Sequence, residues 1–154
     1  MKTLPRVTPF LAAAVLTAAA AAPARAQDMG TPAQTQLHAT LSGAAEVAGG
    51  DTDGTGTFTA TIDKAQGQLC YELSVSGIAT ASAAHIHRGA EGKNGGPVVS
   101  LEAPADGSAK ACTDVDADVL SELAANPAGF YVNVHNADFK AGALRGQLMA
   151  GGGM

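Results

Sequence analysis

Two histidines flank a single isoleucine at residues 84–89, between a run of small apolar residues and a glycine-rich stretch. In an extended strand, successive side chains alternate between the two faces. His85 and His87 are therefore expected on one face of a strand and Ile86 on the other. Two imidazoles presented side by side form a metal-binding pattern, because imidazole is a good ligand for copper and zinc.

Residues 130–135 carry a third histidine and show the same alternation. The apolar Val132 and Val134 share one face, and the opposite face carries the polar side chains of Tyr131, Asn133 and His135. If this strand lies beside the strand of His85, three histidines meet on one face of a sheet. The alternative is that these histidines brace loop backbone through hydrogen bonds, with the glycine-rich residues 88–97 as a candidate partner.

The first 26 residues predict a cleavable signal peptide. Lys2 and Arg6 precede an apolar run at residues 10–22, and a small-residue cleavage sequence ends at Ala26. The apolar run is too short for a comfortable membrane span, and no later stretch of the mature chain approaches one. We therefore expect cleavage after Ala26 and a mature protein that is periplasmic or secreted.

The expected mature chain is acidic. Beyond residue 26, six Lys and Arg stand against fourteen Asp and Glu, which gives a formal net charge of −8. Nucleic acids and anionic membrane surfaces are bound largely through cationic side chains, so both are disfavoured as partners. The expected partner is a metal ion or an unknown extracytoplasmic partner.

Cys70 and Cys112 are the two cysteines of the chain. An even pair in an exported domain predicts one disulfide. A cross-link that closes a loop of this length stabilises a fold by about 4 kcal/mol on the chain-entropy estimate. The alternative, a reactive or metal-bound thiolate, is less favoured because neither cysteine has a CxxC partner or a neighbouring histidine.

Alternating apolar and polar residues separated by turns predict an all-β domain. About seven to eight short strands are expected, including residues 37–42, 57–63, 69–75, 84–87, 98–101, 108–113, 130–135 and 143–149. One short helix is expected within residues 114–126, ended by Pro127. The pattern favours an antiparallel β-sandwich or barrel over residues 37–149, with a flexible leader at 27–36 and a flexible tail at 150–154.

Four motifs in order resemble the CHRD (chordin) domain family: residues 85–89 (HIHRG), 95–99 (GGPVV), 131–135 (YVNVH) and 145–148 (RGQL). The opening at residues 41–47 resembles the first strand and loop of that family. The resemblance implies an immunoglobulin-like β-sandwich of Greek-key type. It implies no settled biochemical activity, so the leading expectation is an exported, non-catalytic binding module with a histidine-based copper site.

A second resemblance concerns copper–zinc superoxide dismutases. An HxH at the end of a strand, a later VxVH strand and a late arginine are similar to the order of copper ligands and active-site arginine in those enzymes. The resemblance implies copper ligation by His85, His87 and His135, with Arg145 guiding an anionic substrate. Residues 88–97 lack the zinc-loop histidines, and a fourth copper histidine is missing unless His38 approaches.

Three functions are therefore carried forward. The leading one is the binding module with copper as its candidate cofactor. The alternatives are a copper-only, dismutase-like redox enzyme that uses Arg145, and a structural or adhesive envelope protein without metal.

Overall fold

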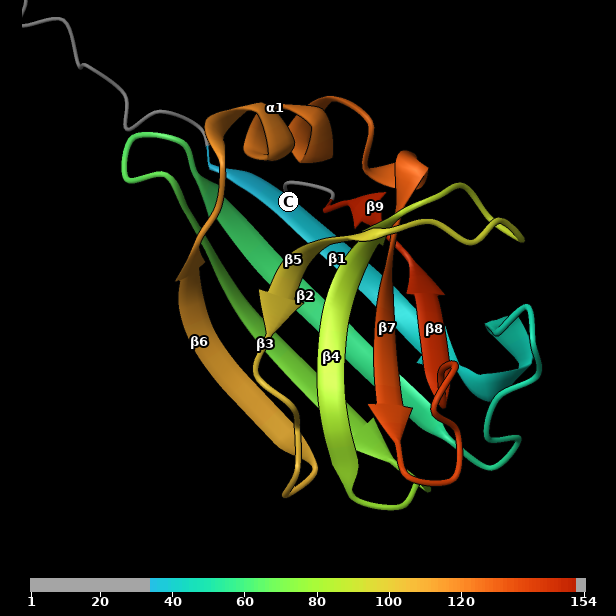
Figure 1. The fold of residues 1–154 in the computed structure, drawn as a ribbon. Coiled ribbons are helices and arrows are strands. Elements are labelled where there is room, and N and C mark those ends of the chain that lie inside the picture. Colours follow the sequence, from blue (N-terminus) through green and yellow to red (C-terminus); the bar gives the residue numbers. More distant parts are fainter. Residues whose placement is uncertain (1–33, 152–154) are drawn as a thin grey trace, which may run out of the picture. The chain divides into compact units, whose positions relative to one another are not determined.

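The structure is a computed structural model in which residues 34–151 are described (Figure 1). The predicted signal peptide, residues 27–33 of the predicted leader and residues 152–154 of the predicted tail lie outside the described residues. Among residues 34–151, no helix is both long enough and apolar enough to cross a membrane.

Antiparallel strands make up most of the described chain. They are β1 (Thr35–Ser42), β2 (Thr55–Asp63), β3 (Gln68–Ser76), β4 (Ala81–Arg88), β5 (Pro97–Leu101), β6 (Ser108–Asp114), β7 (Phe130–Asn136), β8 (Leu144–Gln147) and β9 (Met149–Ala150). The helix α1 (Ala117–Ala125) follows β6, and single 3-10 turns occur at η1 (Gly43–Ala45) and η2 (Pro127–Gly129). The predicted all-β antiparallel class with one short helix is confirmed.

The strands follow the order β5-β4-β7-β8-β1-β2-β3-β6, and β9 pairs with β1. The pairing of β8 with β1 is narrow, since one residue pair, Ser42 with Arg145, connects them in register. The strands on either side of this narrow pairing form two layers, with β4, β5, β7 and β8 in one and β1, β2, β3 and β6 in the other (Figure 1). The immunoglobulin-like, Greek-key detail of the fold stays a prediction.

Apolar side chains from both layers form one core cluster. Leu41 and Phe58 come from the β1–β2 layer, and Ile86 and Val132 come from the β4–β7 layer, all fully buried. Helix α1 lies over one end of the layers (Figure 1), where its Leu120 joins the same cluster. Because the apolar faces of β4 and β7 are buried in this core, their polar faces point away from it.

The C-terminal strand predicted over residues 143–149 is wrong as a single element. The chain forms β8 up to Gln147, and β9 starts again at Met149. At the break, the Leu148 N–H donates to the carbonyl of Phe130, after which the chain pairs with Leu37 and His38 of β1. The interruption therefore marks the point where the chain stops pairing with β7 and continues on β1 alone, which alternation of residue types does not reveal.

Residues 35 and 36 belong to β1, although the leader was expected to reach residue 36. Thr35 pairs with Ile62 at the far end of β2, so the ladder runs two residues beyond the alternating pattern.

Cys70 of β3 and Cys112 of β6 lie directly opposite each other and form a disulfide. The bond joins the last two strands of the second layer, the layer that does not carry the histidine cluster.

Candidate metal centre

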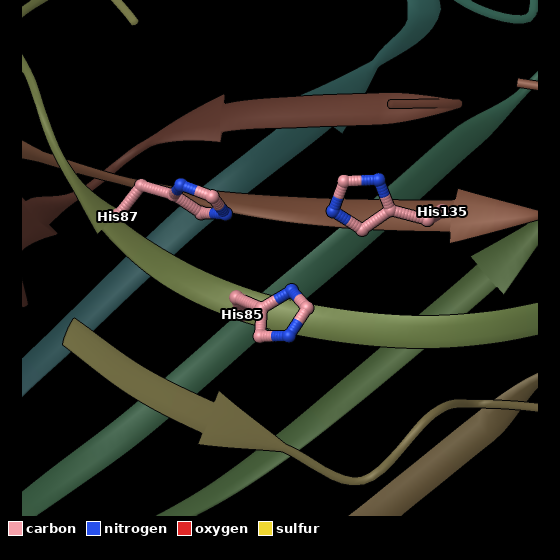
Figure 2. A group of neighbouring side chains, drawn as sticks. All are labelled: His85, His87 and His135. Atoms are coloured by element: carbon pink, nitrogen blue, oxygen red, sulfur yellow. The ribbon is translucent and has the colours of Figure 1, made fainter. Parts of the chain in front are cut away.

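The three predicted histidines meet on the outer face of the β4–β7 pair. In the register of these strands His85 is opposite Asn133, and His135 lies two residues further along β7, opposite Ala83. Ile86, between the two β4 histidines, is fully buried in the core, so the three rings stand on the other face (Figure 2). Strand alternation, as predicted from the sequence, places the rings on this face.

The rings are close enough to share one ion. Their centroids are 5.6 Å apart for His85 and His87, 5.4 Å for His85 and His135, and 6.3 Å for His87 and His135. One ring nitrogen from each histidine lies within 4.8 Å of the others. Figure 2 shows a nitrogen of each ring facing the space between the three. Nitrogens bound to one ion at ~2.0–2.1 Å are roughly 3–4 Å apart, so modest ring movements would bring the three nitrogens to that spacing.

Backbone carbonyls fix the orientation of two of the rings. His87 Nδ1 is 2.9 Å from the Gly95 carbonyl oxygen, and His135 Nδ1 is 3.0 Å from the Lys140 carbonyl oxygen. A carbonyl only accepts, so each Nδ1 must carry the hydrogen. A neutral ring then has its lone pair on Nε2, the atom available to a metal. This carbonyl-to-histidine arrangement is the usual outer support of metal-binding histidines.

Two ring nitrogens of the cluster are buried and lack a hydrogen-bond partner in the described part of the chain. They are His85 Nδ1 and His87 Nε2. A buried polar atom without a partner is costly, and such atoms in native proteins usually meet water or an ion. The unpartnered His87 Nε2 is the same atom that the Gly95 contact leaves with a free lone pair.

Two rings of the cluster, those of His85 and His135, favour the uncharged imidazole. Burial lowers the pKa of His85, and positive charge on His135 or His87 would lower it further. Burial also lowers the pKa of His135, against the opposing effect of the Lys140 carbonyl. Deprotonated nitrogens are what a metal ion needs, because a proton and a metal compete for the same lone pair. At neutral pH these two rings are therefore ready to coordinate.

His38 does not join the three rings. It lies on β1 opposite Thr59 of β2 and beside Met149 of β9. The cluster of potential ligands found within residues 34–151 contains His85, His87 and His135. Three imidazole nitrogens would leave a coordination position of a bound ion open to water or another small ligand.

Arg145 lies under the glycine-rich loop of residues 88–97. Its side chain is buried, with 2% exposed, and it donates hydrogen bonds to Asn94 Oδ1 and to the carbonyls of Ala90 and Lys93. Its guanidinium carbon is 3.5 Å from the centroid of the Tyr131 ring. Tyr131 in turn stacks on His87, with centroids 5.0 Å apart and planes at 13°.

Several supporting residues were not predicted to have a role. Tyr131 and Asn133 were placed on the correct face, but their partners come from distant loops. Asn133 donates to a carboxylate oxygen of Glu46 and to the Leu144 carbonyl. Burial raises the pKa of Glu46, while the Arg145 charge and the Asn133 hydrogen bond act in the opposite direction. The alternation of polar residues along β7 was the one signal in the sequence for this network.

Fold and site together define a class of small β domain that has two antiparallel layers, one disulfide and a cluster of three histidines on an outer face. The family model of the CHRD domain matches residues 37–148, and the chain belongs to the CHRD domain family. The family assignment made from the four sequence motifs is thereby confirmed. No match was found among curated proteins or among solved structures.

Proposed function

We propose that this CHRD domain is a non-catalytic binding module that holds one copper ion through His85, His87 and His135. The observation that carries the proposal is the convergence of three ring nitrogens within 4.8 Å, two of them on rings whose Nδ1 faces a carbonyl. A set of imidazoles without thiolate or carboxylate suits copper and zinc. Among divalent ions, the general affinity order favours Cu(II) over Zn(II).

Metal titration of the purified protein tests this proposal. Isothermal titration with Cu(II) and Zn(II), and an anaerobic competition assay with Cu(I), should give one ion per chain. His85→Ala and His135→Ala should each weaken binding by at least ten-fold. His38→Ala is the matched control, because His38 lies outside the cluster on β1. Absence of stoichiometric binding, or equal losses in His38→Ala and His85→Ala, would contradict the proposal.

A dismutase-like enzyme is the alternative function, and it requires a structural feature that metal binding alone does not require. Catalysis with an anionic substrate needs a cation that faces the metal, whereas the Arg145 donors lie against loop acceptors. We expect the copper-loaded protein to remove superoxide no faster than an equal concentration of a weakly active copper chelate. A rate far above that control, lost in Arg145→Ala but with copper still bound, would favour the enzyme.

Export is part of the same proposal. The disulfide between β3 and β6 supports it, because such bonds persist in oxidising compartments. N-terminal sequencing of the protein recovered from periplasmic and culture fractions should begin at Gln27. Recovery of a chain that still carries residues 1–26 in the cytoplasmic fraction would contradict export.

A further inference from the structure

We propose that Arg145 is a positioning residue for the candidate metal centre. It holds the loop of residues 89–96 against the outer face of the sheet, and the loop in turn fixes the ring of His87. The metal-binding consequence rests on the proposed function, whereas the effect on the His87 ring does not. This role differs from the guidance of an anionic substrate that the sequence resemblance implied.

The three acceptors that the Arg145 side chain has within residues 34–151 belong to one loop. Nη2 donates to the carbonyls of Ala90 at 3.1 Å and Lys93 at 2.7 Å, and Nη1 donates to Asn94 Oδ1 at 3.0 Å. A planar guanidinium can serve several acceptors at fixed angles, which an ammonium group cannot do. Arg145 therefore gathers consecutive parts of the loop around one rigid group.

A second side chain of β8 holds the start of the same loop. Gln147 Nε2 lies 2.9 Å from the carbonyl oxygen of Gly89 and shares its two hydrogens between this carbonyl and those of Ala128 and Phe130, each at 2.7 Å. Gln147 and Arg145 are two positions apart on one strand, so they share its outer face. Strand β8 thus anchors the loop at its first residue and again over residues 90–94.

The anchored loop acts on His87 through Gly95. The Gly95 carbonyl is the partner of His87 Nδ1, and the Gly95 N–H donates to the hydroxyl oxygen of Tyr131 at 3.3 Å. Tyr131 also contacts Arg145 and His87 directly, because its ring lies under the Arg145 guanidinium and stacks on the His87 ring. Two routes, one polar and one aromatic, therefore connect Arg145 to the orientation of a single imidazole.

The position of Gly95 shows how closely the loop is seated. A Cβ atom added there would lie 1.6 Å from the Arg88 carbonyl oxygen, so the loop has no room for a side chain at this point. The adjacent Gly96 carbonyl accepts the Arg88 N–H at 3.0 Å, which ties the loop's exit to the end of β4. A shift of the loop therefore moves the one acceptor that selects the His87 tautomer.

The test uses metal-free protein first, because the ring orientation does not require the ion. Long-range proton–nitrogen correlation spectra of ¹⁵N-labelled protein report the tautomer of each histidine. Wild type should show His87 with its hydrogen on Nδ1. Arg145→Lys should show a mixture of His87 tautomers with the His135 tautomer unchanged, because His135 is held by Lys140 in a different loop.

Metal affinity is measured next on the same variants. Arg145→Lys should weaken copper binding by about ten-fold, which is typical for the loss of an outer support of a metal ligand. Asn94→Ala removes one anchor from an exposed loop position and should change the His87 spectrum in the same direction but less. Lys110→Ala, on β6 in the other layer, is the control and should change neither measurement.

The outcomes are distinguishable. A single Nδ1–H tautomer of His87 in both Arg145→Lys and Asn94→Ala, with unchanged copper affinity, would overturn the positioning role. Equal disturbance of His87 and His135 in the folded Asn94→Ala variant would also overturn it, because it would indicate general loosening. If wild type binds no metal while the His87 tautomer still depends on Arg145, the proposed function fails and the positioning of His87 stands.

Discussion

His85 of β4 and His135 of β7 bring their ring centroids to 5.4 Å, although the two residues are far apart in the sequence. The antiparallel register, in which Ala83 faces His135 and His85 faces Asn133, produces this approach. Two positive rings at this distance would repel, and both are partly removed from water. The fold therefore disfavours protonation of these two imidazoles, so their protonation should lower the free energy of unfolding.

The stability of the metal-free protein should depend on pH through these rings. Burial holds the pKa of His85 and of His135 below the ordinary value of 6.5. The unfolded chain then takes up protons before the folded one does, so the free energy of unfolding falls as the pH drops through about 6.5. Above that range the rings are neutral in both states and contribute no slope.

Urea unfolding of metal-free protein at several pH values between 8 and 5 measures this slope. The double variant His85→Gln, His135→Gln should show a smaller loss of stability over the same range. His38→Gln serves as the control. An equal slope in wild type and in the double variant would show that other groups set the pH dependence.

Metal should stabilise the folded state. An ion that binds the folded protein alone raises the free energy of unfolding by about 2.7 kcal/mol at a free concentration of one hundred times its Kd. Differential scanning calorimetry with buffered Cu(II) or Zn(II) should therefore give a higher Tm that a chelator reverses. His87→Ala should lose most of this increase, and an increase of the same size in that variant would place the bound ion elsewhere.

The disulfide should support the fold without supporting the site. Cys70 and Cys112 are 42 residues apart in the sequence and connect β3 to β6, in the layer that does not carry the cluster of His85, His87 and His135. The variant Cys70→Ser, Cys112→Ser should lose about 4 kcal/mol of unfolding free energy, because the open chain regains loop entropy. Copper affinity of the folded variant should stay within two-fold of wild type. A large loss of affinity would indicate coupling between the layers.

The sequence was sufficient to place His85, Ile86 and His87 on their faces, because alternation in a strand depends on local geometry alone. From the sequence alone, the position of the His135 strand beside the His85 strand is a hypothesis, because the order of strands in a sheet depends on long-range packing. Long-range packing also explains why residues 143–149 do not form the single strand predicted from the sequence. The break at Leu148 depends on the contact with the Phe130 carbonyl and on the pairing of β9 with β1, which the types of residues 143–149 do not reveal.

The surroundings of the site were less predictable than its ligands. The acceptors for His87 and His135 are carbonyls of Gly95 and Lys140, and every residue type offers a carbonyl. Their positions follow from the paths of two loops. Residue type and motif order single out Arg145, but only the path of the loop over β8 shows that its donors are directed at two backbone carbonyls and the Asn94 side chain.

The buried carboxylate of Glu46 allows a further prediction. Burial raises the pKa of Glu46 more than the Arg145 charge and the Asn133 hydrogen bond lower it. The folded state therefore holds this proton more strongly than the unfolded chain does. The free energy of unfolding should fall as the pH rises through and above the ordinary value of 4.5, because the carboxylate must then ionise within the fold.

Glu46→Gln tests this directly, because the amide resembles the uncharged acid and keeps an oxygen for the Asn133 side chain. At pH 7 the variant should unfold at a higher urea concentration than wild type, and the difference should shrink as the pH falls toward 4.5. Asp106→Asn, at an exposed turn, is the control and should show no such trend. A variant less stable than wild type at pH 7 would mean that the attraction between the Glu46 carboxylate and Arg145 outweighs the cost of burying the charge.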